Sequence, residues 1–389
     1  MNIDPLAASL TADMTAWRRD LHAHPEIGFE ETRTARLVAD KLRGWGLSVH
    51  EGLAGTGVVG TLTGRAGSPR SIGLRADMDA LPLQELNEFD YGSQNAGRMH
   101  ACGHDGHTAM LLGAAQCLAR SRNFAGTVRF IFQPAEEGRG GAERMVKEGL
   151  FEQFPCEAVY GLHNWPALST GMLGVRVGPM LASMDQIDIQ VVGRGGHGAL
   201  PQHAVDPVVT AAHIVTALQT LVSRSTSATE AAVVSITCIQ GGTAHNIIPQ
   251  SVQLRGTVRS FSAAVRRDLE QGINRIAHST AQAFGATAAV QYTRQAPAVV
   301  NSERETRQAI AAAGAVLGED HVVQDVEPTM GSEDFSFMLD GRPGAYVFLG
   351  QGSPEHCCSI HSPHYDFNDA LLPIGASYWI RLVEQVLTA

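Results

Sequence analysis

A thiol and several imidazoles lie close together in the segment His-Ala-Cys-Gly-His-Asp-Gly-His, residues 100–107. Zinc and other borderline-soft divalent metals bind this mixture of sulfur and nitrogen ligands. Further candidate ligands follow far along the chain: the pair Glu136-Glu137, His163 and His361. Because these residues are scattered, only tertiary folding can bring them together. This layout is typical of a catalytic metal site rather than of a local structural zinc site.

The glutamate pair indicates hydrolysis in particular. A metal hydrolase needs one carboxylate to hold a metal and another to take a proton from metal-activated water, and Glu136 and Glu137 can divide these two tasks. The alternative, a solvated surface pair, is disfavoured because the pair directly follows an apolar strand and precedes Gly138, Gly140 and Gly141.

For other polar residues near these candidate ligands in the sequence, structural roles are alternatives to metal binding. We expect Asp77 and Asp79 either to orient a ligand or to cap the turn after a strand. His100, His107 and His364 fit orienting or capping roles as well as ligand roles. Arg18-Arg19 is typical of a solvated helix face, and we expect His22 and His24 to lie near the site without touching metal.

The elements that must position these residues alternate between strand and helix. Apolar runs predict strands over 58–62, 72–77, 128–132 and 158–162, and helical patterns occupy two runs within 6–45 and the stretch 105–120. The glutamate pair and His163 come just after predicted strands. Alternating strands and helices indicate an α/β fold with a mainly parallel sheet and helices on both faces, and such sheets place their sites at the carboxyl ends of the strands.

The pattern changes near residue 183. A half-exposed strand over 184–192 is followed by a helix that Asp206-Pro207 opens, then by strands over 233–239 and 252–258, a helix capped by Ser262, and a strand over 288–292. This β-α-β-β-α-β order matches the ferredoxin-like unit. We therefore predict a catalytic domain made of residues 1–182 and 294–389, with an α+β satellite domain, 183–293, inserted into it.

Bulk properties exclude several functions. The formal net charge of −10 argues against a nucleic-acid partner or an anionic membrane partner. No apolar run reaches membrane-spanning length, and the first residues lack the pattern of a secretory signal. The six cysteines have no regular spacing, which suits reduced thiols. These features predict a cytoplasmic protein.

Five motifs together resemble the M20 metallopeptidase family, and more closely its amidohydrolase branch of hippurate hydrolases, N-acyl-amino-acid amidohydrolases and auxin-conjugate hydrolases. They are RRDLHAHPEIGFE at 18–30, RADMDALP at 75–82, MHACGHDGH at 99–107, QPAEEG at 133–138 and GSEDF at 331–335. The resemblance spans nearly the whole chain in order. It implies the same two-domain build and an assembly as a homodimer or homotetramer.

The resemblance also implies roles for single residues. It places two divalent metal ions, which could be Zn, Mn, Co or Ni, on Cys102, His104, Glu137, His163 and His361, and it makes Glu136 the general base. The loop GRGGHG at 193–198 resembles the one whose histidine, here His197, polarises the substrate carbonyl, in some relatives across the dimer. The motif GGTAHNIIP at 241–249 and the later Arg259 resemble a grip for the substrate carboxylate, with Asn246 as its second member, although Arg255 competes for the arginine's part.

We therefore expect a metal-dependent amidohydrolase that cleaves the amide of N-acyl or N-aroyl amino acids to a carboxylic acid and a free amino acid. Acetyl, benzoyl, indoleacetyl and longer acyl groups all remain open. A metallo-dipeptidase or carboxypeptidase would use the same site on peptides. A carbamoyl-cleaving relative would release ammonia. A structural metal protein would need four protein ligands and no proton acceptor.

Overall fold

The computed structural model describes residues 1–388 and divides the chain into two compact units. The first unit consists of Met1–Met180, Val300–Glu327 and the segment that begins at Asp334. The second unit consists of Leu181–Val299 and Pro328–Glu333, so it is inserted into the first. Within residues 1–388, no helix has both the length and the apolar composition needed to cross a membrane.

The first unit is built on an eight-stranded sheet with the order β1-β2-β4-β3-β5-β16-β6-β15. The pairs β3–β4, β3–β5, β5–β16 and β6–β15 are parallel, whereas β1–β2, β2–β4 and β6–β16 are antiparallel. The prediction of a mainly parallel sheet is therefore confirmed. The strands are β1 (Ser48–Leu53), β2 (Gly57–Thr63), β3 (Ala66–Asp77), β4 (Ala125–Gln133), β5 (Ala158–Ser169), β6 (Leu173–Val175), β15 (Val322–Gln324) and β16 (Gly344–Gly352).

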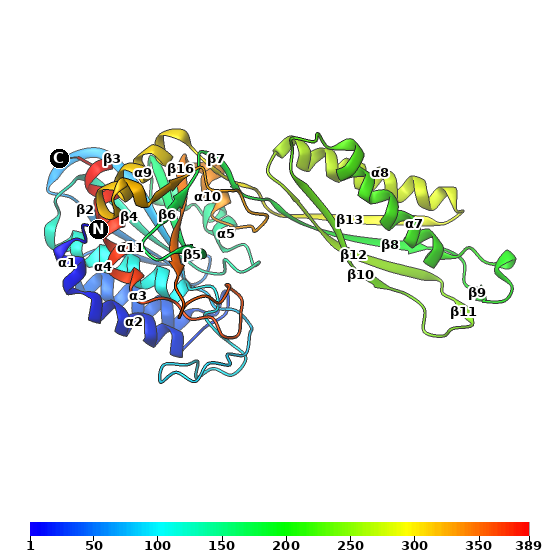
Figure 1. The fold of residues 1–389 in the computed structure, drawn as a ribbon, viewed down its shortest axis with the longest axis horizontal. Coiled ribbons are helices and arrows are strands. Elements are labelled where there is room, and N and C mark those ends of the chain that lie inside the picture. The colour runs from blue at the N-terminus through cyan, green and yellow to red at the C-terminus, as the bar shows by residue number, and fades with distance from the viewer. Residues whose placement is uncertain (389) are drawn as a thin grey trace. The chain divides into compact units, whose positions relative to one another are not determined.

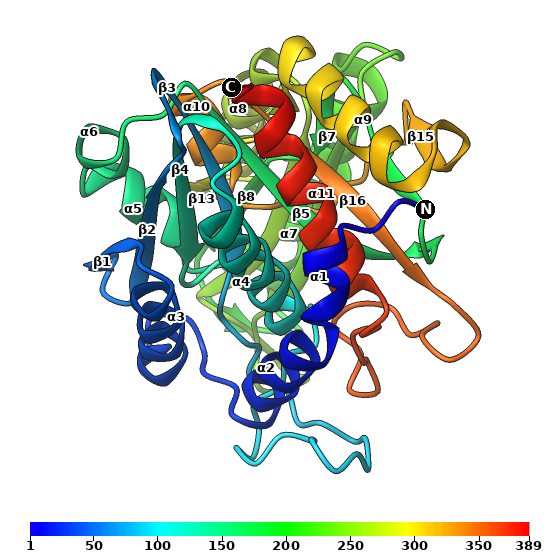
Figure 2. The ribbon, with the colours of Figure 1, turned by 90° about the vertical axis from the view of Figure 1, so that its left-hand side faces the viewer.

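Helices cover both faces of this sheet, with α4 and α11 on one side of the strands and α5 and α10 on the other (Figure 1). The helix α4 packs against α2 and α11 (Figure 2). The helices of the first unit are α1 (Pro5–Ser9), α2 (Thr11–Ala23), α3 (Thr32–Gly44), α4 (His104–Ser121), α5 (Gly141–Lys147), α6 (Leu150–Gln153), α9 (Glu303–Leu317), α10 (Ser336–Gly341) and α11 (Leu371–Val386), with a 3₁₀ turn at Glu319–His321.

The helix α4 is buried along most of its length, because every residue from His104 to Leu118 is buried. Close packing here requires glycine: a Cβ at Gly113 would lie 2.2 Å from Sδ of Met14, and one at Gly375 would lie 2.1 Å from Sδ of Met110. The middle of α4 is thus closely packed against its neighbours, and His104 is buried at the N-terminus of the same helix.

The second unit is a four-stranded antiparallel sheet in the order β10-β12-β8-β13, and the helices α7 and α8 pack together against it. The chain order is β8-α7-β10-β12-α8-β13, as predicted for a ferredoxin-like unit. The side chain of Asp206 accepts hydrogen bonds from the N–H groups of Val208 and Val209, and Ser262 accepts one from Val265, so both predicted N-caps are present.

The second unit also contains a short two-stranded ribbon in addition to its main sheet. Its elements are β8 (Met184–Val192), α7 (Pro207–Thr220), a π turn (Leu221–Ser225), β10 (Ala232–Gln240), β12 (Ser251–Ser260), α8 (Ala263–Ala283) and β13 (Thr287–Ala296), with a ribbon of β9 (Gly196–His197) and β11 (Ile247–Ile248) and a 3₁₀ turn at Pro201–His203. The strands β7 (Gly178–Leu181) and β14 (Val299–Asn301) pair with each other where the chain enters and leaves the insertion.

Several elements were not predicted from the sequence. They include β16, which pairs with β5 in the middle of the sheet, and the long helices α9 and α11. The strand β5 also continues to Ser169 instead of ending before His163.

Candidate metal centre

The candidate ligands lie near one edge of the large sheet, because each follows or extends one of four neighbouring parallel strands. Cys102 and His104 come after β3, Glu137 comes after β4, His163 lies on β5, and His361 follows β16. The backbone N–H of His361 donates to the carbonyl oxygen of Ala101 over 2.7 Å, which ties the last of these segments to the first. Tertiary folding therefore collects residues separated by more than 250 positions.

The five candidate ligands form two groups that share one residue. Cys102, His104 and His163 form a fully buried group, and Cys102 forms a second group with Glu137 and His361. The Sγ atom of Cys102 lies 3.3 Å from Nε2 of His163, and Oε1 of Glu137 lies 3.2 Å from Nε2 of His361. Two ligands of one tetrahedral zinc ion lie roughly 3.3–3.8 Å apart, given metal–ligand distances of about 2.0–2.3 Å. Both separations are close to this range, so each of the two groups suits one divalent ion.

The ring orientations of the two buried histidines also suit metal binding. Nδ1 of His104 donates to the backbone oxygen of Asp79 over 2.9 Å, and Nδ1 of His163 donates to the backbone oxygen of Asn164 over 2.6 Å. In a neutral ring this leaves the lone pair on Nε2. Nε2 of His104 is buried and has no hydrogen-bond partner among residues 1–388. A buried lone pair of this kind is costly unless a cation or a donor meets it, so the donor set fits a metal ion.

The charges around these ligands favour a cation. Burial, and then the negative charges of Glu137, Glu136 and Asp77, hold the pKa of the Cys102 thiol well above its ordinary value. Burial alone would lower the pKa of His104, but Asp77 and Asp79 outweigh it and raise that pKa to about 10. Carboxylates contribute to both shifts, and a bound divalent ion would neutralise their charge while keeping the sulfur as a thiolate.

Asp77 and Asp79 each contact the segments that carry the candidate ligands. Asp79 accepts a hydrogen bond from the N–H of Glu137 over 3.0 Å, and its Oδ1 lies 3.3 Å from Nδ1 of His104. Asp77 contacts Nδ1 of His107 at 2.6 Å and is paired with Arg75 at 2.7 Å. These contacts agree with an orienting role rather than with a simple turn cap.

Three histidines could be either metal ligands or orienting residues on the sequence alone, and their surroundings in the structure differ. His107 also lies with Asp77 and His104 in a third possible ligand group, but its Nε2 is already within 2.6 Å of Asn164 Oδ1. His100 is buried, and neither of its ring nitrogens has a hydrogen-bond partner within residues 1–388. His364 is exposed. Asn164 was missed by sequence reasoning, because its only signal is its position next to His163.

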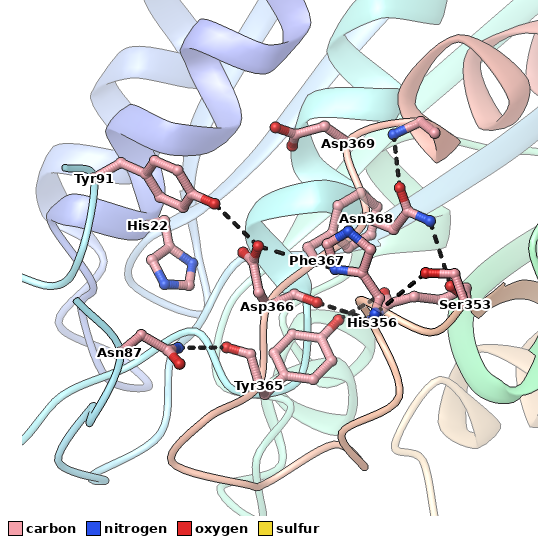
Figure 3. A network of polar contacts seen from close by, with 12 residues as sticks. His22, Asn87, Tyr91, Ser353, His356, Tyr365, Asp366, Phe367, Asn368 and Asp369 are labelled. Atoms are coloured by element: carbon pink, nitrogen blue, oxygen red, sulfur yellow. Dashed lines mark hydrogen bonds and ion pairs between the residues drawn. The ribbon is translucent and has the colours of Figure 1, made fainter. Parts of the chain in front are cut away.

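Polar contacts hold Tyr365 and Asp366, which follow His361 closely in the chain (Figure 3). Oη of Tyr91 donates to Asp366 over 3.0 Å, and Nδ2 of Asn87 donates to the carbonyl oxygen of Tyr365 over 2.9 Å. The Oη of Tyr365 is in turn hydrogen-bonded to Asn164 over 2.7 Å. This network links the His361 segment to the strand that carries His163.

Arg18 corrects one sequence expectation, because it is fully buried rather than solvated. Its guanidinium donates to Asp369 over 2.6 Å and to Asp366 over 3.1 Å, so it also anchors the His361 segment. Only Arg19 is half exposed. Neighbouring positions on a helix point about 100° apart, and the acidic partners lie about 350 positions away, so the sequence pattern of α2 held no signal for this burial.

In the second unit, His197 lies on β9 and Asn246 directly precedes β11, and the N–H of Gly198 donates to the carbonyl oxygen of Asn246 over 2.8 Å. The His197 side chain is exposed, and its Nδ1 accepts a hydrogen bond from the N–H of Ala199 over 3.1 Å. The neutral ring therefore carries its proton on Nε2, which makes that atom a hydrogen-bond donor.

Arg259 lies elsewhere in the second unit. It stands near the last residue of β12, whereas the β9–β11 ribbon adjoins the first residues of that strand, so the strand separates them by roughly 25 Å at about 3.3 Å per residue. Arg259 is half-buried, and its Nη1 has no hydrogen-bond partner within residues 1–388. The competing Arg255 is paired with Asp188 at 3.3 Å.

A mainly parallel α/β sheet that gathers a thiol, imidazoles and carboxylates at the carboxyl ends of its strands defines a metal-dependent hydrolase. Comparisons with known proteins agree. Residues 73–385 match the family described as peptidase family M20/M25/M40. The chain is 42% identical over 387 residues to the hippurate hydrolase of Campylobacter jejuni, covering 100% of both chains.

Two further relatives resemble the chain strongly. The N-acyl-L-amino acid amidohydrolase of Geobacillus stearothermophilus is 44% identical over 287 residues, which covers 73% of this chain and 77% of that protein. The structure of a Bacillus subtilis protein described as a dinuclear metal binding peptidase from the M20 family superposes with a TM-score of 0.85 at 33% identity, over 98% and 99% of the two chains. The chain belongs to peptidase family M20/M25/M40, which confirms the resemblance found in its motifs.

Proposed function

We propose that the protein is a metal-dependent amidohydrolase that cleaves the amide bond of N-acyl or N-aroyl amino acids. The observation that carries this proposal is the sharing of Cys102 between two ligand groups, with Glu136 in a further group together with His104 and Glu137. This arrangement provides a proton acceptor beside a site for two divalent ions. The relatives named hippurate hydrolase and N-acyl-L-amino acid amidohydrolase support the substrate class.

Bound divalent ions would supply an activated water molecule and polarise the substrate carbonyl. Cys102, His104, Glu137, His163 and His361 would hold the ions. A thiolate ligand favours zinc, while manganese, cobalt and nickel remain compatible with the imidazole and carboxylate ligands. Glu136 takes the proton from the water molecule and passes it to the leaving amine. The N–H at Nε2 of His197 donates to the oxygen that becomes negatively charged.

Asn246 and Arg259 are proposed to bind the substrate carboxylate, because the arginine fork matches a carboxylate and the asparagine amide can donate beside it. Since they lie near opposite ends of β12, the two residues would meet one substrate only if two copies of the chain contribute. A homodimer, alone or within a homotetramer, would satisfy this requirement. Exposed apolar side chains on α7 and β10 support such an assembly: Val208, Val209 and Ile239 are 46%, 45% and 59% exposed.

A cytoplasmic location is part of the proposal, and the state of the thiols supports it. All six cysteines are free in the structure, which suits a reducing cytoplasm.

A dipeptidase or carboxypeptidase acting through the same residues is the second candidate function, because the family name covers peptidases.

The test is release of free amino acid from N-benzoyl, N-acetyl and N-indoleacetyl amino acids and from unblocked dipeptides, after loading with Mn²⁺, Zn²⁺ or Co²⁺. The Glu136→Gln variant, loaded to the same metal content, is the blank. We expect metal-dependent turnover of at least one N-acyl amino acid and a loss of roughly 10²–10⁴-fold in the blank. Turnover of dipeptides alone would establish the peptidase function instead. A blank as active as the unaltered protein would remove Glu136 from the mechanism.

A further inference from the structure

A buried carboxylate outside the ligand set holds the backbone that precedes the glutamate pair. Glu31 is fully buried at the residue before α3. Its Oε1 accepts a hydrogen bond from the backbone N–H of Ala135 over 2.8 Å, and its Oε2 accepts one from Oγ1 of Thr56 over 2.6 Å. One oxygen of this side chain thus reaches the residue directly before Glu136.

Ala135 has a backbone conformation that residues with a Cβ atom rarely adopt. Its φ angle is +56°, in the left-handed region. The carbonyl oxygen of the same residue accepts the N–H of Gly141 over 3.0 Å, so both of its backbone polar groups are held. Such strain persists only where the surroundings enforce it, and it gathers at functional sites.

The packing around Ala135 also holds this residue in place. A Cβ atom at Gly28 would lie 3.0 Å from both Cα and Cβ of Ala135, so the segment before α3 is pressed against this residue. The guanidinium of Arg139 donates to the carbonyl oxygen of Gly28 over 3.0 Å and fastens the far side of the same loop. The segment 28–31 therefore clamps the loop on which Glu136 and Glu137 lie.

We propose that Glu31 is a positioning residue: by holding the N–H of Ala135, it keeps that residue left-handed and so directs Glu136 and Glu137 toward the metal centre. This inference rests on the proposed function for the role of Glu136, but its effect on Glu137 concerns metal binding alone. Without Glu31, Ala135 favours negative φ, and the two carboxylates that follow it turn away from the ligands with which they are grouped.

The test compares Glu31→Ala and Glu31→Gln with Thr56→Val, which removes the other contact of Glu31 and leaves Ala135 untouched. Metal affinity is measured by competition with a chelator, using Zn²⁺ alone, and kcat and KM are measured on the best N-acyl amino acid. We expect Glu31→Ala to weaken metal affinity roughly 10-fold and to lower kcat more than it changes KM. Glu31→Gln keeps an acceptor oxygen and should stay within about threefold of the unaltered protein. Thr56→Val should alter thermal stability more than either property.

A second substitution tests the backbone mechanism directly. Glycine adopts positive φ about as readily as negative φ, so Ala135→Gly in the Glu31→Ala background should restore metal affinity and kcat severalfold. Absence of that recovery, or equal losses in Glu31→Ala and Thr56→Val, would overturn the positioning role. If the unaltered protein cleaves no N-acyl amino acid, the proposed function fails, while the chelator measurement still decides the role of Glu31.

Discussion

Cys102 and His163 meet with Sγ and Nε2 3.3 Å apart, and the same thiol also belongs to the group that contains Glu137 and His361. The sulfur is therefore the point at which two candidate metal sites join. Its substitution should act on both sites, whereas substitution of a residue from one group should act on one.

We expect Cys102→Ala to lose both bound ions and His361→Ala to lose one. The physical reason is that a thiolate shared by two cations offsets their mutual repulsion, which an outer ligand does not do. Elemental analysis of metal per chain after dialysis measures this. His364→Ala, an exposed residue near His361, is the control and should keep the full content. One ion retained in Cys102→Ala would show that the thiol serves a single site.

For His197→Ala we expect kcat to fall by roughly 10²–10³-fold, the usual cost of removing one donor to a developing oxyanion. Thermal stability should barely change, because the side chain is exposed. Steady-state kinetics and a melting curve check both parts. The exposed His203 on the neighbouring turn provides the matched control, and comparable losses in His203→Ala would assign the effect to the loop rather than to the imidazole.

Arg18→Ala should destabilise the protein by about 3–5 kcal/mol, because it leaves Asp366 and Asp369 without their buried partner. Arg19 pairs with Asp369 at 2.9 Å from a half-exposed position, so Arg19→Ala should cost no more than about 1 kcal/mol. Urea unfolding of the two variants at equal metal content gives both values. Similar losses of stability in the two variants would mean that the burial of Arg18 does not strengthen its ion pairs.

Stability should depend on pH through His22. Burial alone would lower the pKa of His22, but its hydrogen bonds to Asp105 and Glu85 raise it to about 9. The folded state therefore binds the proton more tightly than the unfolded state, whose pKa is about 6.5, and the stabilisation is complete below pH 6.5 and lost as pH rises to about 9. His22→Gln should be less stable than the unaltered protein by about 3 kcal/mol at pH 6, with the gap closing by pH 9.5. A gap that grows with pH would contradict this sign.

Much of the centre was predictable because its signals are local. Cys102 and His104 are two positions apart in the sequence. Glu137 follows a strand that is predicted by the strand's own apolar residues. The order of elements in the second unit is likewise visible in alternating and helical patterns. A local pattern, read segment by segment, is enough for both.

Other features depend on pairs of residues that are far apart in the sequence. Arg18 with Asp369 and Glu31 with Ala135 join segments whose own patterns are ordinary, so nothing local predicts burial of the charge or the strain of the backbone. The strand β16 differs, because its run of alanine, tyrosine, valine, phenylalanine and leucine carried a strand signal. Its place beside β5 still depended on tertiary structure.

The position of β16 has a consequence for synthesis of the chain. The strand pairs with β5 in the middle of the large sheet, yet it is made only after the whole inserted unit. The main part of that unit is continuous from Leu181 to Val299, so it can fold as it leaves the ribosome. The first unit must wait with the edge of β5 uncovered, and an exposed strand edge invites pairing with other chains. Overexpression should therefore expose the nascent first unit to aggregation, and slower translation should raise the soluble yield.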